Sequence, residues 1–193
     1  MRVRLLGPLA AAALALAATA THAQRAFEIS PAVQAEIDRQ KSVIAAWAAS
    51  PEVVSAVREQ NARGPIPGMD NAKWKATRRA DLTVRGFQMN PAGRFLKRKL
   101  DESGVTYSEA FLSAARGEKV AFVEKTTSYI HKGQPKFDVP FQTGQTWQGK
   151  PELDDSSQMY MLQLSVPVLD QAKPIGVLVV GVNVSHLERI ARR

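Results

Sequence analysis

An alternation of apolar and polar residues near the end of the chain predicts a β-hairpin. Over residues 158–170 the apolar side chains fall on one face of an extended strand, whereas Gln163 and Ser165 fall on the other. Residues 175–184 are apolar on both faces, which is typical of a strand in the middle of a sheet. Because a short polar turn joins the two runs, we expect them to pair.

The first part of the chain has helical periodicity instead. Ser-Pro pairs at residues 30 and 50 resemble helix starts, with serine as the N-cap and proline at the first helical position. Residues 30–64 therefore form either one long kinked helix or two helices in series. Their apolar stripe begins with Val33, Ile37, Ile44 and Trp47.

Shorter elements are expected between these two regions. Amphipathic patterns predict helices within residues 70–80 and 90–104, and alternation predicts strands at 105–114 and 120–125. Residues 126–157 are polar and rich in Gly and Pro, so they form a long loop of the kind that is usually functional or partly structured. Helices followed by two hairpins indicate an α+β fold built on an antiparallel sheet.

The N-terminus has the features of an export signal. Arg2 and Arg4 precede an apolar stretch over residues 5–18, and Thr21-His22-Ala23 fits a signal peptidase site. We expect a signal peptide over residues 1–23 and a single periplasmic domain over 24–193, with an uncleaved membrane anchor as the alternative. The chain has no Cys, which excludes disulfides and a lipoprotein anchor.

Charge and motifs narrow the function classes. The formal net charge of +8 is that of a solvated basic surface or of a surface that attracts an anionic ligand. Export argues against a nucleic acid partner. The sequence has no G-x-S-x-G element, no phosphate-binding glycine loop and no His or Cys set with metal-ligand spacing. We therefore expect no enzyme, no catalytic residue, no metal and no cofactor.

Four segments carry a resemblance to a known family. They are residues 70–74 (DNAKW), 90–96 (NPAGRFL), 116–121 (RGEKVA) and the stretch from 154 to 177. Together they resemble the Cache superfamily, the extracytoplasmic PAS-like sensor domains also called PDC domains. The resemblance covers about residues 30–190. It implies an antiparallel sheet with a long helix across one face and a ligand pocket on the other face, under the long loop.

The resemblance also implies partners, and the chain departs from the family in two ways. Most members sense a small molecule and drive a membrane-bound sensor kinase, cyclase or chemoreceptor, whereas this chain looks like a single, stand-alone Cache domain. Many relatives carry an acidic segment in the loop, where residues 127–136 here are TSYIHKGQPK. A preference for a cation or amine is therefore not carried over, and a polar or anionic ligand is expected instead.

The candidate ligand-binding residues come from the expected sheet and loop. From the sheet, Tyr107, Glu109 and Gln163 are expected to point into the pocket, and Lys125 ends a strand that should line it. In the loop, Tyr129, His131, Lys132 and Lys136 would converge on an anion such as a carboxylate, and Trp147 would be a lid or a stacking ring. The alternatives are core tyrosines, a surface lysine and a solvated basic loop.

Three functions remain open at this point. The first is a periplasmic small-molecule sensor module that reports to a membrane-bound signalling partner. The second is an interaction module without a small ligand, which would form a homodimer through the N-terminal helix by way of Val33, Ile37 and Ile44. The third is a signal-anchored accessory subunit of a receptor.

Overall fold

The computed structural model describes residues 27–193, so the expected signal peptide over residues 1–23 lies outside the described residues. Along the described part, a group of helices is followed by a β-hairpin, one helix, the remaining strands and a last helix. The helices are α1 (Pro31–Ala48), α2 (Pro51–Arg63), α3 (Asn71–Ala76), α4 (Leu82–Met89), α5 (Pro91–Glu102), α6 (Pro135–Thr143) and α7 (Val184–Ala191). The strands are β1 (Tyr107–Ala114), β2 (Lys119–Phe122), β3 (Trp147–Gln148), β4 (Glu152–Asp154), β5 (Met159–Asp170) and β6 (Lys173–Asn183).

The strands form an antiparallel sheet in the order β2-β1-β6-β5-β3, and β4 also pairs with β5. The predicted hairpin is confirmed as β5 and β6, and the apolar strand β6 lies in the middle of the sheet as expected. Gln171 and Ala172 form its turn with positive φ angles of 46° and 66°. A two-residue turn of this kind matches the right-handed twist of the strands. The α+β fold is confirmed.

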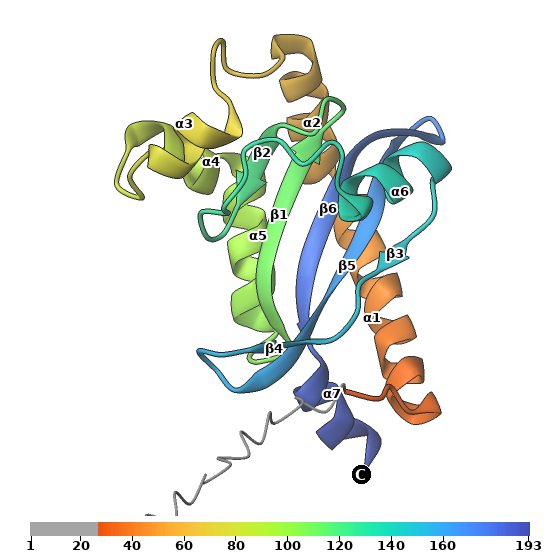
Figure 1. Cartoon of the computed structure of the whole chain (residues 1–193). Coiled ribbons are helices and arrows are strands. Elements are labelled where there is room, and N and C mark those ends of the chain that lie inside the picture. Colours follow the sequence, from red (N-terminus) through yellow and green to blue (C-terminus); the bar gives the residue numbers. More distant parts are fainter. Residues whose placement is uncertain (1–26) are drawn as a thin grey trace, which may run out of the picture.

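One face of the sheet carries the larger apolar core. Figure 1 shows α1, α2 and α5 behind the sheet, and α7 packs against α1. The alternating residues of β5 and β6 point to this side, including Leu162, Leu164, Leu178 and Val180. The N-terminal segment forms two helices, because Pro51 begins α2 directly after the C-terminal turn of α1. The apolar stripe of α1, from Val33 to Trp47, is buried against the sheet.

The opposite face carries a second, smaller core. Its centre is Trp74 of α3, which is fully buried and packs edge-on against the rings of Phe87 and Phe122. The indole N–H donates to the carbonyl oxygen of Thr126 at 2.8 Å, which attaches the start of the long loop to α3. Farther along this face, α6 packs over β5 and β6.

Residues 126–157 contain more regular structure than their composition indicates. They form α6 and the short strands β3 and β4, and α4 is a further helix that periodicity did not reveal. Each of these elements has fewer than ten residues, and α6 includes Pro140, so no apolar period could develop. Over residues 27–193, no helix combines the length and the apolar character that a membrane span requires.

The strand β1 contains a β-bulge that changes which side chains share a face. Tyr107 pairs with Val182 and Glu109 pairs with Gly181, so Ser108 is the extra residue. Tyr107 and Glu109 were expected on one face because they are two residues apart. The bulge instead turns Tyr107 toward the helices and leaves Glu109 on the opposite face.

Candidate functional site

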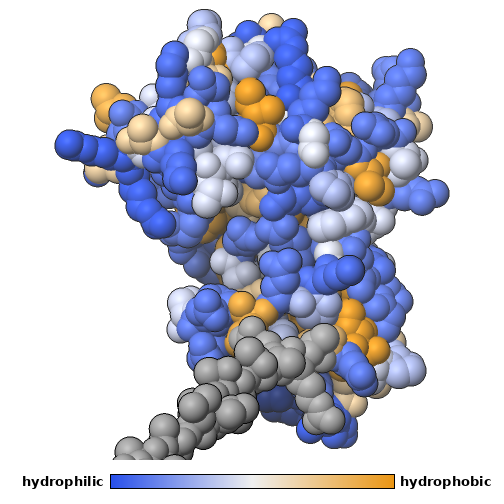
Figure 2. All heavy atoms as spheres, in the orientation of Figure 1, coloured by the Kyte–Doolittle hydropathy of each residue, from blue (hydrophilic) through white to orange (hydrophobic). Residues whose placement is uncertain are grey.

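A cavity of about 350 Å³ opens on the sheet face that points away from α1. Its walls come from β1, β5, β6, α6 and the segments around β3 and β4. This face is turned to the viewer in Figure 2, where it is mostly hydrophilic with small, separate apolar groups. A cavity of this size suits a small molecule.

The inner wall of the cavity includes one row of residues across three strands. Glu109 of β1, Gly181 of β6 and Gln163 of β5 are direct cross-strand neighbours, and all three line the cavity. A Cβ at Gly181 would lie 2.6 Å from Ser108 Oγ and 2.7 Å from Glu109 Cγ. The missing side chain at this position therefore leaves room for Glu109 over the sheet.

A chain of hydrogen bonds runs along the inner wall. Lys136, at the start of α6, donates from Nζ to Gln163 Oε1 at 3.0 Å. Gln163 in turn donates from Nε2 to Glu109 Oε1 at 2.6 Å. Both ends of this series of hydrogen bonds are charged groups, so the amide of Gln163 links a cation to a carboxylate. The wall thus offers a ligand both a donor and an acceptor.

Behind this wall lies a buried group that we call the inner cluster, formed by Phe111, Lys119 and His131. The Lys119 Nζ lies 3.4 Å from the centre of the Phe111 ring, and the His131 ring centre lies 4.7 Å from it. Lys136 Nζ lies 5.8 Å from the same ring centre, so the cluster borders the cavity wall. Neither Lys119 Nζ nor His131 Nδ1 has a hydrogen-bond partner.

Burial sets the protonation of the inner cluster. Desolvation lowers the pKa of Lys119 well below its usual value; Glu109 opposes this effect, and Lys136 adds to it. The pKa of His131 falls to about 2, because of desolvation first and then the charges of Lys119 and Lys136. The interior of this face therefore favours neutral forms of both groups in the absence of an anion.

The structure brings four of the expected ligand-binding residues together. Glu109, Lys136, Trp147 and Gln163 all line the cavity. Trp147 is half-buried on β3, where it pairs with Ser165, and it contributes to the lining of the cavity. His131 lies in the inner cluster next to the cavity rather than on its surface.

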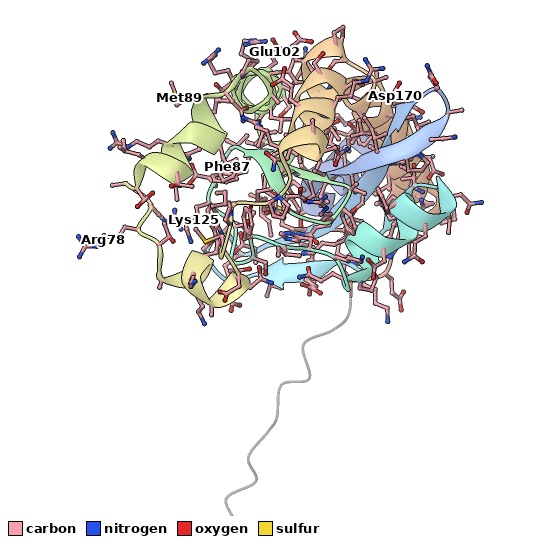
Figure 3. The ribbon with its side chains drawn as sticks, turned by 90° about the horizontal axis from the view of Figure 1, so that it is seen from above. Arg78, Phe87, Met89, Glu102, Lys125 and Asp170 are labelled. Atoms are coloured by element: carbon pink, nitrogen blue, oxygen red, sulfur yellow. The ribbon has the colours of Figure 1, made fainter. Side chains whose placement is uncertain are left out.

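The other four expected residues lie elsewhere. Lys132 is exposed in the turn before α6 and is not among the residues that line the cavity. Tyr107 packs against Trp47, and its hydroxyl donates to Gln40 Oε1 on the α1 side of the sheet. β2 ends at Phe122, three residues before Lys125. Lys125 Nζ lies 4.7 Å above the Trp74 ring, on the α3–α4 side in Figure 3 and away from α6.

Tyr129 belongs to the second core and holds the loop in place. Its hydroxyl accepts a hydrogen bond from Ile66 N at 2.8 Å, and its backbone N–H donates to Asn71 Oδ1 at 2.8 Å. Its ring packs near Trp74. Burial raises its pKa, so the hydroxyl acts as a neutral hydrogen-bonding group.

Sequence reasoning missed Lys119 because β2 is irregular. Ser113 pairs with Lys119 and the preceding Leu112 pairs with Ala121, so Val120 has no direct partner. Strict alternation along this strand therefore assigns the residues on one side of the irregularity to the wrong face of the sheet. A signal was present, since a lysine beside a run of apolar residues in a predicted strand is uncommon.

The described residues contain no group of three His, Cys, Asp or Glu side chains that could hold a metal ion. The fold and the cavity define a small α+β domain with a polar site on one sheet face. Comparison with known protein families finds no match, and no curated protein sequence matches the chain.

Solved structures resemble the chain at low sequence identity. One is the sensor domain of the Vibrio cholerae histidine kinase DctB, at 18% identity and a TM-score of 0.42, covering 83% of this chain and 58% of that one. Another is the sensory domain of the Campylobacter jejuni chemoreceptor Tlp3, at 14% identity and a TM-score of 0.45, covering 82% and 59%. The ligand-binding domain of the Pseudomonas aeruginosa chemoreceptor PctC, in complex with GABA, has 12% identity and a TM-score of 0.44, covering 82% and 60%. The chain thus spans about three fifths of each of these structures.

Proposed function

We propose that this chain is a small-molecule-binding sensor module of the Cache type. The observation that carries the proposal is the cavity on the sheet face away from α1, which Glu109, Lys136, Trp147 and Gln163 all line. A donor, an acceptor and an aromatic ring around one cavity are the usual components of a small-molecule site. They orient a polar ligand, while the ring covers its apolar part.

Binding is tested by thermal unfolding in the presence of amino acids, organic acids, amines and nucleobases. A ligand at 100 times its Kd stabilises the folded state by about 2.7 kcal/mol. The hit is then tested on Lys136→Ala, which removes a wall donor, and on Lys132→Ala, which removes the same charge from the exposed loop nearby.

The expected result is weaker binding in Lys136→Ala and unchanged binding in Lys132→Ala. If both variants lose binding equally, the effect comes from net charge and not from the cavity. If no compound stabilises the protein, the proposed function is refuted.

The place of action and the signalling partner are part of the same proposal. We propose that export through residues 1–23 delivers the module to the periplasm, where it reports its state to a membrane-bound kinase, cyclase or chemoreceptor. Intact-mass measurement of the secreted protein tests the first step, with a mature chain starting at Gln24 as the expected result. A mass that includes Met1 would support an anchored form instead.

A homodimer through α1 would need a surface other than the one first considered. Val33, Ile37 and Ile44 are at most 2% exposed, because they pack inside the same chain. The outer face of α1 contains Val43, which is 41% exposed. Light scattering with and without ligand measures the oligomeric state directly.

A further inference from the structure

The cavity side of the sheet contains an unusual set of buried polar groups. Ser113, Lys119, His131 and Ser165 each have a buried side-chain atom with no hydrogen-bond partner. Lys119 and both serines are completely inaccessible to solvent, and His131 is 3% exposed. Buried donors and acceptors of this kind are normally paired, because an unpaired one costs free energy. Their concentration on one face indicates a missing partner.

The orientation of the Lys119 side chain indicates that the missing partner would lie near the cavity. Its Cα lies opposite Ser113, two residues along β1 from Phe111. Its amine nevertheless lies over the Phe111 ring, so the side chain leans along the sheet toward Glu109, which is two residues farther on. Glu109 lines the cavity, and so does Lys136, whose amine approaches the same ring from α6.

The hydrogen bonds around this point leave Lys119 without a polar partner. Lys136 and Glu109 are linked through Gln163, whereas the Lys119 amine has no hydrogen-bond partner. It lies over the Phe111 ring, but a ring face takes only one N–H donor, so donors are left over whether the amine is neutral or charged. An anion beside Lys119 and Lys136 would supply the missing acceptors.

We propose that the cavity takes a carboxylate ligand, whose carboxyl group enters between Lys136 and Gln163 and binds Lys119 and Lys136. This inference rests on the proposed binding function and names the ligand class for the same site. The ligand replaces Gln163 as the partner of Lys136 and gives Lys119 its first hydrogen-bonding partner. The rest of the molecule lies in the cavity against Trp147.

The experiment uses the full-length mature protein and compounds in matched sets. Each carbon skeleton is supplied as its carboxylate, its primary amide and its amine, for example butyrate, butyramide and butylamine, and formate is added as the smallest carboxylate. Affinities are measured by thermal unfolding and calorimetry. Lys119→Met is compared with the parent protein, and Lys132→Met is the control for loss of one lysine.

Carboxylates are expected to bind, and their amides and amines to bind at least about tenfold more weakly. In Lys119→Met, carboxylate affinity should fall about 10- to 100-fold, whereas Lys132→Met should keep it. Met fills nearly the same space over Phe111, and circular dichroism of the unliganded variant verifies that it folds. Lys136→Met removes the second proposed donor and should also lower carboxylate affinity.

Two results would overturn the inference and leave the binding function standing. One is a preference for the amine or the amide over the carboxylate. The other is full carboxylate affinity in a folded Lys119→Met. Failure of every compound in all three forms, together with failure of every compound in the wider screen, refutes the binding function itself.

Discussion

The substitution Lys119→Met should change how stability depends on pH. The lysine is fully buried, and desolvation lowers its pKa far below the usual 10.5 of the unfolded chain. Between the lowered pKa and 10.5 the unfolded state binds one more proton than the folded state. The free energy of unfolding therefore rises with pH in this window, by up to about 1.4 kcal/mol per pH unit. From pH 7 to 9 the gain reaches up to about 2.7 kcal/mol.

The variant has no amine to titrate, so this rise should be missing from it. Urea unfolding of both proteins at pH 7, 8 and 9, in buffers free of carboxylates, measures the difference. The measurement stops at pH 9 because burial raises the pKa of Tyr107 to about 12 and also raises that of Tyr129, which reverses the slope above pH 10. A constant stability difference between the two proteins across the three pH values would show that Lys119 keeps its proton in the folded state.

Three further substitutions test other parts of the structure. Burial lowers the pKa of His131 to about 2, so the free energy of unfolding of the parent protein should fall by up to about 1.4 kcal/mol per pH unit as pH drops below 6.5. His131→Phe should remove this pH dependence, which urea unfolding between pH 5 and 7 measures. Gly181→Ala places a Cβ 2.7 Å from Glu109 Cγ, so it should weaken binding of a ligand found by the screen while the protein stays folded, as calorimetry would show. Tyr107→Phe removes the hydrogen bond to Gln40 and should cost about 1 kcal/mol in urea unfolding without changing ligand affinity.

Much of the fold could be predicted because long periodic segments determine it. The apolar strand β6 has no polar residue before Asn183, apart from its first position, and such a strand is stable only in the middle of a sheet. The start of α1 follows from Ser30, whose hydroxyl accepts the Val33 N–H. Short elements such as β3 and β4 could not be predicted, because two or three residues carry no period and pair only where β5 is already in place.

The site was only half predictable, for a related reason. Gln163 follows from the regular alternation of β5, and Lys136 and Trp147 follow from the loop that covers the sheet. Tyr107 and Lys119 lie next to irregular positions in β1 and β2, and each irregularity exchanges the two faces of its strand. Such a shift depends on how neighbouring strands twist and pair, which the local sequence does not encode.

The net charge of +8 says less about the proposed ligand than the position of one unpaired, buried lysine does. Each ion pair among the described residues has at least one well-exposed partner, as in Arg58–Asp170, and such pairs are screened by water and salt. These surface charges balance locally and say little about binding. Lys119 has no hydrogen-bond partner, lies away from water and belongs to the inner cluster next to the cavity wall. A buried lysine either loses its proton or gains an anionic partner. We therefore base the proposed anion on the position of Lys119 in the fold and not on the composition of the chain.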